Sequence, residues 1–78
     1  PAVEWAVVQY YISKPGKSAL VVYDAGGRLM AIVAEGMALP GTGTETIHTG
    51  TLPPGVYFCV LTATGGRDVV KFAVAGVK

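Results

Sequence analysis

The chain has 78 residues, of which 51% are hydrophobic and only 14% are charged, and its formal net charge is +1. A chain of this length forms one small domain, and this composition excludes an intrinsically disordered chain. The six basic and five acidic residues are spread along the sequence and form no cluster that could neutralise a row of phosphates, so we expect no nucleic acid partner.

No apolar run approaches the ~18 residues of a membrane-spanning segment, and the longest, Leu29 to Ala34, has the length of a strand. A single cysteine excludes an internal disulfide framework and a cysteine-based zinc site. Because the sequence has no initiator Met and no signal-peptide pattern, we expect Pro1 to be a cut point in a longer chain or an artificially trimmed end.

Short apolar segments separated by turn residues fill the first half of the chain. The sequence predicts a strand or strand pair over Val3 to Ser13, rich in Val, Trp, Tyr and Ile, which runs into a turn at "KPGKS". A second strand is predicted over Ala19 to Tyr23 and a third over Arg28 to Glu35. The "DAGG" stretch between them, Asp24 to Gly27, suits a tight hairpin.

The second half continues the same pattern after a predicted loop, "GMALPGTG". A Thr-rich strand is predicted over Thr44 to Gly50, and a hairpin pair over Val56 to Thr64 and Asp68 to Val74. No segment sustains a helical period, and strands recur every ~8 to 12 residues. The sequence therefore predicts one all-β domain over residues 1–78, a small antiparallel β-sandwich of about seven strands.

Four features that could carry chemistry are better explained by structure. The "GKS" at Gly16 to Ser18 lacks the upstream glycine and the following helix of a phosphate-binding loop, and the "GTG" at Gly41 to Gly43 lacks the rest of a dinucleotide-binding motif. His48 has no evident companion ligands and is interpreted as a half-exposed strand residue. Cys59, between Phe58 and Val60, has no base beside it and is interpreted as a buried apolar side chain.

The remaining polar and aromatic residues do not indicate catalysis. The carboxylates lie near strand ends or turns, with no spacing that pairs two of them for acid and base work, and Asp24 is expected to bond nearby backbone. We therefore expect no catalytic residue, no metal and no cofactor. The aromatic side chains are expected mainly to pack in the core, with a sugar-stacking platform as the alternative; they are Trp5, Tyr10, Tyr11, Tyr23, Tyr57, Phe58 and Phe72.

Three blocks of the sequence, "LVVYDAGGRLM", "LPPGVYFCVLTATGG" and "VVKFAVAGVK", together carry a family likeness. The chain resembles the C-terminal sorting domains (type A) of the type IX secretion system, and is similar to the Ig-like domain of flagellar hook-cap proteins. The "PA" at Pro1 and Ala2 looks like the tail of the opening motif of these domains. The matching residues are Tyr23, Asp24, Gly27 and Arg28 in a hairpin, Pro53, Pro54, Gly55 and Tyr57 in a turn and strand, and Lys71 and Lys78 in the terminal segment.

The resemblance implies a non-catalytic domain at the C-terminus of a secreted bacterial protein, exported through the periplasm to the medium or cell surface. The resemblance implies that the sorting and recognition candidates are Gly55, Tyr57, Lys71 and Lys78. It gives the hairpin and proline residues the role of a structural motif. The implied partners are the upstream domain of the same polypeptide and the secretion machinery. An accessory domain packed on an extracellular enzyme and a carbohydrate-binding module remain as alternatives.

The orientation of the central strand follows from the alternation of side chains with period 2. Tyr57, Cys59 and Leu61 are expected to form its core side. Val56, Phe58 and Val60 are expected to point outward, since relatives often carry a basic residue at the position of Val60. Val56 and Phe58 would then belong to an apolar outer patch suited to docking on a neighbouring domain.

Overall fold

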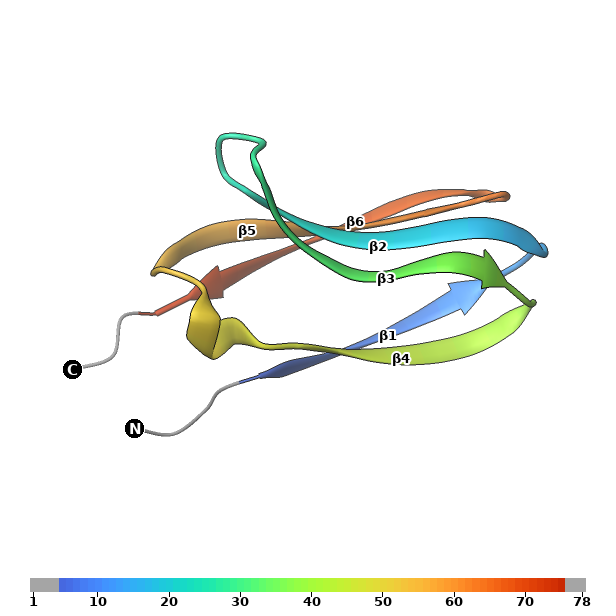
Figure 1. Ribbon diagram of the computed structural model, residues 1–78, viewed down its shortest axis with the longest axis horizontal. Coiled ribbons are helices and arrows are strands. Elements are labelled where there is room, and N and C mark those ends of the chain that lie inside the picture. The colour runs from blue at the N-terminus through green and yellow to red at the C-terminus, as the bar shows by residue number, and fades with distance from the viewer. Residues whose placement is uncertain (1–4, 76–78) are drawn as a thin grey trace.

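The computed structural model describes residues 5–75, which form six β-strands and one short 3-10 helix (Figure 1). The all-β prediction is confirmed, and a seventh strand is not found among these residues. They also contain no helix long and apolar enough to cross a bilayer. The elements are β1 (Ala6–Ile12), β2 (Gly16–Asp24), β3 (Leu29–Ala38), β4 (Gly41–Ile47), η1 (Thr49–Thr51), β5 (Gly55–Ala63) and β6 (Gly66–Val74).

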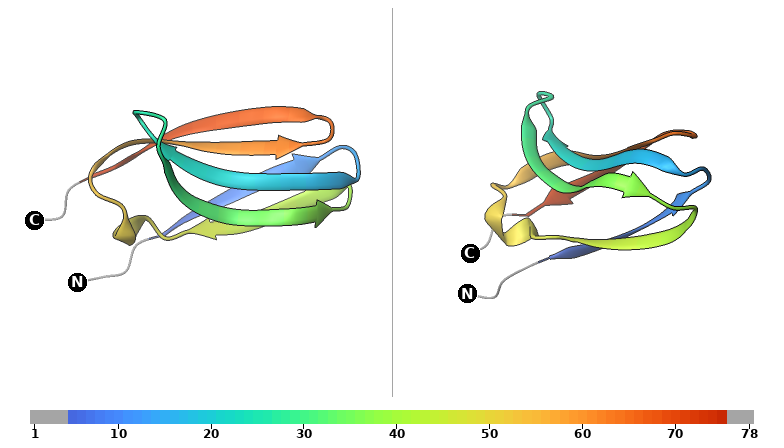
Figure 2. Two further views of the ribbon diagram at one scale, coloured as in Figure 1. Left: turned by 45° about the horizontal axis from the view of Figure 1, so that its top comes forward. Right: turned by 45° about the vertical axis from the view of Figure 1, so that its right-hand side comes forward.

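The strands form two antiparallel sheets of unequal size, which lie in two layers in Figure 2. One sheet pairs β1 with β4 alone, and the other has four strands in the order β3-β2-β5-β6. The chain changes sheets three times, between β1 and β2, between β3 and β4, and between β4 and β5. The two-stranded sheet is therefore narrower than the sheet it packs against.

The core lies between the two sheets and takes residues from both. Tyr57, Cys59 and Leu61 of β5 are buried in it, which confirms the predicted core side of this strand. The remaining buried members of the core cluster are Ile12, Leu20, Val22 and Ile47. Because β1 and β4 each contribute one buried isoleucine, the narrow sheet closes the core by contact rather than by hydrogen bonding.

The side chains of the four-stranded sheet that point away from this core form what we call the outer face. Along β5 these are Val56, Phe58, Val60 and Thr62, as alternation requires. Val60 lies outside the core cluster, as predicted, yet it is only 7% exposed. Its cross-strand neighbours explain this, because Val60 lies between Val21 of β2 and Val69 of β6 on the same face.

Both ends of β4 differ from the sequence prediction, and β2 starts at Gly16, within the predicted turn "KPGKS". The predicted loop over residues 36–43 is reduced to Leu39 and Pro40, because β3 continues to Ala38 and β4 starts at Gly41. Pairing of the whole of β4 with β1 overrides the low strand propensity of glycine. The predicted strand over residues 44–50 ends at Ile47, and η1 follows, so His48 is an exposed connector rather than a strand residue.

Four of the seven aromatic side chains are not packed in the core, so the core-packing expectation is wrong for them. Tyr23 and Phe58 point to the outer face. Trp5 is 60% exposed and Tyr11 is 65% exposed. Tyr11 alternates with the buried Ile12 and therefore points to the solvent side of β1, opposite Thr42 of β4. The apolar composition of β1 indicated a buried segment. In the two-stranded sheet with the Thr-rich β4, however, only one face of β1 is covered.

Candidate functional site

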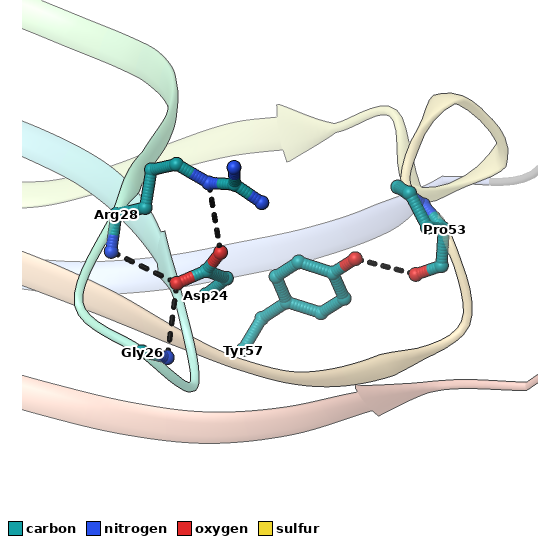
Figure 3. A network of polar contacts seen from close by, with 5 residues as sticks. All are labelled: Asp24, Gly26, Arg28, Pro53 and Tyr57. Carbon is teal, nitrogen blue, oxygen red and sulfur yellow. Dashed lines mark hydrogen bonds and ion pairs between the residues drawn. The ribbon is translucent and has the colours of Figure 1, made fainter.

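The hairpin between β2 and β3 is fixed by one carboxylate. Asp24 Oδ1 accepts hydrogen bonds from the backbone N–H groups of Gly26 (3.0 Å) and Arg28 (2.8 Å), and Asp24 Oδ2 accepts one from Arg28 Nε at 3.1 Å (Figure 3). The Asp24 carbonyl also accepts from the N–H of Gly27, whose φ of 87° suits glycine. The sequence prediction that Asp24 bonds nearby backbone is confirmed.

These hydrogen bonds favour the charged form of Asp24. The backbone N–H of Arg28 has the largest effect and holds the pKa of the Asp24 carboxyl below its ordinary value of 3.8, assisted by the Arg28 side chain and the Gly26 N–H against partial desolvation. The guanidinium of Arg28 is itself open to solvent, with 79% of its side chain exposed. The ion pair between Asp24 and Arg28 therefore helps to shape the turn, and its electrostatic contribution to stability is small.

Tyr57 ties the start of β5 to the connection that precedes it. Its hydroxyl donates a hydrogen bond to the backbone carbonyl of Pro53, four residues earlier (Figure 3). Its ring is buried and stacks on Phe72 of β6, with ring centroids 5.6 Å apart and planes inclined by 24°. Tyr57 thus joins two neighbouring strands and the incoming loop through one side chain.

The Pro-Pro-Gly sequence, residues 53–55, connects η1 to the start of β5. Pro53 and Pro54 are exposed and lie between η1 and β5, where their missing N–H groups leave no ladder position unpaired. Gly55 is the first residue of β5 and has a φ of 155°, at the edge of the region that favours glycine. A β-branched side chain at Gly55 would therefore be strained.

Of the two basic candidates, Lys71 lies among the described residues and Lys78 does not. Lys71 of β6 is exposed and lies directly opposite Phe58, so its side chain belongs to the outer face. Lys78 lies outside the described residues. Gly55 and Tyr57 position the strand, whereas Lys71 is the described sorting candidate that projects into solvent.

Strand register brings the motif residues together at one end of the four-stranded sheet. Asp24 pairs with Tyr57, and Tyr23 pairs with Phe58, which in turn pairs with Lys71. The three sequence blocks that carry the family likeness therefore meet in space, and one cross-strand row on the outer face takes a residue from each. The sequence analysis did not predict the adjacent row of aliphatic residues on β2, β3 and β6. The pattern that indicates such a row is the apolar run in β2 and β5, which is continuous rather than alternating.

Cys59 lines an open groove of about 640 Å³ between β1 and β6, where the wide sheet extends beyond the narrow one. The residue is nonetheless only 3% exposed, and burial raises the pKa of its thiol above the ordinary value. A protonated, covered thiol is a poor nucleophile. The site therefore agrees with the interpretation of Cys59 as a core side chain.

Residues 5–75 offer no other assembly of reactive groups. They contain no cluster of three or more His, Cys, Asp or Glu side chains that could hold a metal ion. Gly16 to Ser18 begin β2 and Gly41 to Gly43 begin β4, so neither glycine stretch precedes a helix. The arrangement described here is suited to contact with another surface, and its most distinctive part is the outer face.

Comparison with known proteins adds no neighbour: no protein-family model, no curated protein and no solved structure matches the chain. The candidate site is therefore described from the geometry of its residues alone.

Removal of the Tyr57 hydroxyl and removal of its ring are expected to have separate effects. Tyr57→Phe loses one hydrogen bond to an exposed residue and should lower the free energy of unfolding by about 1 kcal/mol. Tyr57→Ala also empties a core site and should cost about 3 to 5 kcal/mol. Chemical denaturation measures both, with Tyr11→Phe as the matched control on an exposed ring. Equal stability of Tyr57→Phe and the wild type would show that the hydroxyl does not hold the loop.

The hairpin carboxylate should make stability depend on pH. Since the folded-state pKa of Asp24 is lowered, its contribution is present above the unfolded value of about 3.8 and is lost as pH falls through the folded value. Asp24→Asn should therefore melt below the wild type at pH 7, and the two melting temperatures should converge near pH 2. Glu45→Gln serves as the control. A difference that persists unchanged at pH 2 would contradict the assigned cause.

Proposed function

We propose that this chain is a non-catalytic C-terminal sorting domain of a secreted bacterial protein, recognised by the type IX secretion machinery as a folded surface. The proposal includes export through the periplasm and a final location in the medium or at the cell surface. It assigns recognition to the outer face, with Lys71 at its margin, and gives Gly55 and Tyr57 the role of holding β5 in position.

An Ig-like description of the fold is part of this proposal. Two antiparallel sheets that share one core support it, as does Tyr57, because Ig-type sandwiches carry a tyrosine whose hydroxyl bonds to backbone a few residues upstream. The two-stranded partner sheet is a departure from the usual Ig arrangement.

The observation that carries the proposal is the row Tyr23, Phe58 and Lys71 on the outer face. Each residue comes from a different motif block, and the row places the exposed Lys71 next to Phe58, with Tyr23 on the other side of Phe58. A surface of this kind suits recognition, since apolar side chains give contact area and a charge at the margin fixes orientation. It offers no group positioned to make or break a covalent bond.

Export of a fusion protein tests the proposal. The chain is fused to a periplasm-directed reporter in a bacterium with a type IX system, and wild type is compared with the double variant Lys71→Ala, Lys78→Ala and with a control, Lys14→Ala. Since Lys71 is exposed, the double variant should keep the wild-type melting temperature. Export of wild type and Lys14→Ala with retention of the double variant is the expected result. Wild type that stays in the periplasm would contradict a sorting function and favour the accessory domain.

A second candidate function, carbohydrate binding, is favoured by one specific observation. Trp5, Val7 and Tyr11 are exposed at β1, and the solvent side of the paired strand β4 presents Thr42 and Thr46 beside them. Exposed aromatic rings with neighbouring hydroxyl groups suit stacking on sugar rings. This surface lies on the opposite side of the molecule from the outer face.

Pull-down on insoluble polysaccharides tests this candidate. If the β1 surface binds sugar, Tyr11→Ala and Trp5→Ala should each weaken binding by about tenfold or more, since loss of a stacked ring costs on the order of 1 kcal/mol or more. Phe58→Ala, on the outer face, is the control that should leave binding unchanged. Absence of binding by the wild-type chain would remove the candidate.

A further inference from the structure

The four-stranded sheet runs from β3 through β2 and β5 to β6 (Figure 2, left). On its outer face, three consecutive rows of side chains run across all four strands. Residues directly opposite each other in antiparallel strands share a face, so the strand registers define each row. The rows are Glu35, Ala19, Thr62 and Arg67; then Ile32, Val21, Val60 and Val69; then Leu29, Tyr23, Phe58 and Lys71.

The middle row is entirely aliphatic and is open to solvent at both ends. Ile32 is 53% exposed and Val69 is 51% exposed, while Val21 and Val60 between them are more covered. A sheet face that meets only water normally carries polar residues. The row therefore needs a covering surface that is itself apolar and flat.

The charges on this face identify which surface fits. Glu35 on β3 and Arg67 on β6 stand at opposite ends of the same row. Three strand spacings separate them, or roughly 14 Å, so the two side chains cannot pair within one copy. No ion pair between described residues involves either of them. An ideal covering surface would present a base opposite Glu35 and an acid opposite Arg67, which is what a second copy of the same face presents.

Of the two-fold axes that run along or across the strands, one achieves this match. A two-fold axis parallel to the strands, between β2 and β5, places β3 of one copy over β6 of the other and keeps each row over itself. Glu35 then faces Arg67 of the second copy twice, and the aliphatic rows face each other. A two-fold axis perpendicular to the strands would instead set Arg67 over Lys71 of the second copy, which is repulsive.

We propose that two copies of this chain associate through their outer faces about a two-fold axis parallel to the strands, held by the middle aliphatic rows and by two Glu35–Arg67 pairs between copies. Aligned sheets cross at about 30°, and the long Arg67 side chain spans the offset that this angle introduces at the sheet edges. Tyr23 faces Phe58 of the second copy in the same arrangement, which adds an aromatic pair on each side of the axis.

The size of the face sets the strength of the association. Four strands at ~4.8 Å spacing and a row-bearing length of ~20 Å give a projected area of roughly 400 Å² per copy, which is at the low end for specific interfaces. The association is therefore a weak, reversible one. It goes beyond the proposed function, and because Lys71 lies at the same face, a paired copy would have to separate before secretion machinery could contact that face.

Sedimentation velocity on the 78-residue chain, from about 10 µM to about 1 mM, measures the association. Wild type should shift from monomer toward dimer over this range. Glu35→Arg and Arg67→Glu each set like charges face to face and should weaken dimerisation at least tenfold. An equimolar mixture of the two variants should recover it, because the mixed dimer sets the two basic side chains of one variant opposite the two acidic side chains of the other. Lys14→Glu, in an exposed turn off the face, should behave as wild type.

Recovery of the dimer in the mixture distinguishes a specific pairing of the two faces from damage to the fold. Misfolding is excluded if both variants keep the wild-type melting temperature, as exposed positions predict. A wild-type chain that remains monomeric at every concentration would overturn the proposal, and it would favour the upstream domain as the covering surface. A dimer that neither reversal weakens, or single variants whose mixture fails to associate, would also overturn it. These results are independent of the export assay, which is read on a fusion in the periplasm.

Discussion

The four-stranded sheet carries apolar side chains on both faces, whereas residues 5–75 supply only one small sheet to cover them. This imbalance is the constraint on which the rest of the structure depends. The core face is closed by β1 and β4, each of which contributes one buried isoleucine. The outer face has no such cover among the described residues, so the apolar row through Val21 and Val60 remains available for contact. A strand whose apolar run is continuous is normally covered on both faces, and β5 is such a strand.

Local devices keep this sheet in register so that the outer face has a definite pattern. The Asp24 carboxylate shapes the hairpin that connects β2 to β3, and Tyr57 fixes the start of β5 to the carbonyl of Pro53. A slip of one residue in either strand would move every outer side chain to the core side. The turn therefore sets Leu29 opposite Tyr23, and the tyrosine positions β5, whose Phe58 lies between Tyr23 and Lys71. The motif residues Asp24 and Tyr57 therefore fix the positions of the strands, and the side chains of the outer face are the ones available for contact with another surface.

Periodicity and turn chemistry were sufficient to predict the class of the fold. Alternation divided the side chains of β5 into two sets, and the resemblance, through the outward position it implies for Val60, assigned Tyr57, Cys59 and Leu61 to the core. Asp24 was identified by its place before two glycines. The division into sheets of two and four strands could not be predicted, since pairing between β1 and β4 depends on tertiary contacts rather than on either sequence. For the same reason the exposure of Tyr11 was missed, because its strand is as apolar as a buried one. The three rows of the outer face required the registers, and with them the meeting of Glu35 and Arg67 in one row.

Methyl nuclear magnetic resonance of the isolated chain tests the central claim, that the outer face is a contact surface, most directly. Spectra recorded along a dilution series would follow the methyl groups of Val21, Ile32 and Val69 against those of Val7, which lies on the solvent side of β1. The account predicts concentration-dependent shifts at the three outer-face residues with Val7 unchanged. Shifts confined to Val7, or outer-face methyl signals that stay fixed at every concentration, would contradict it.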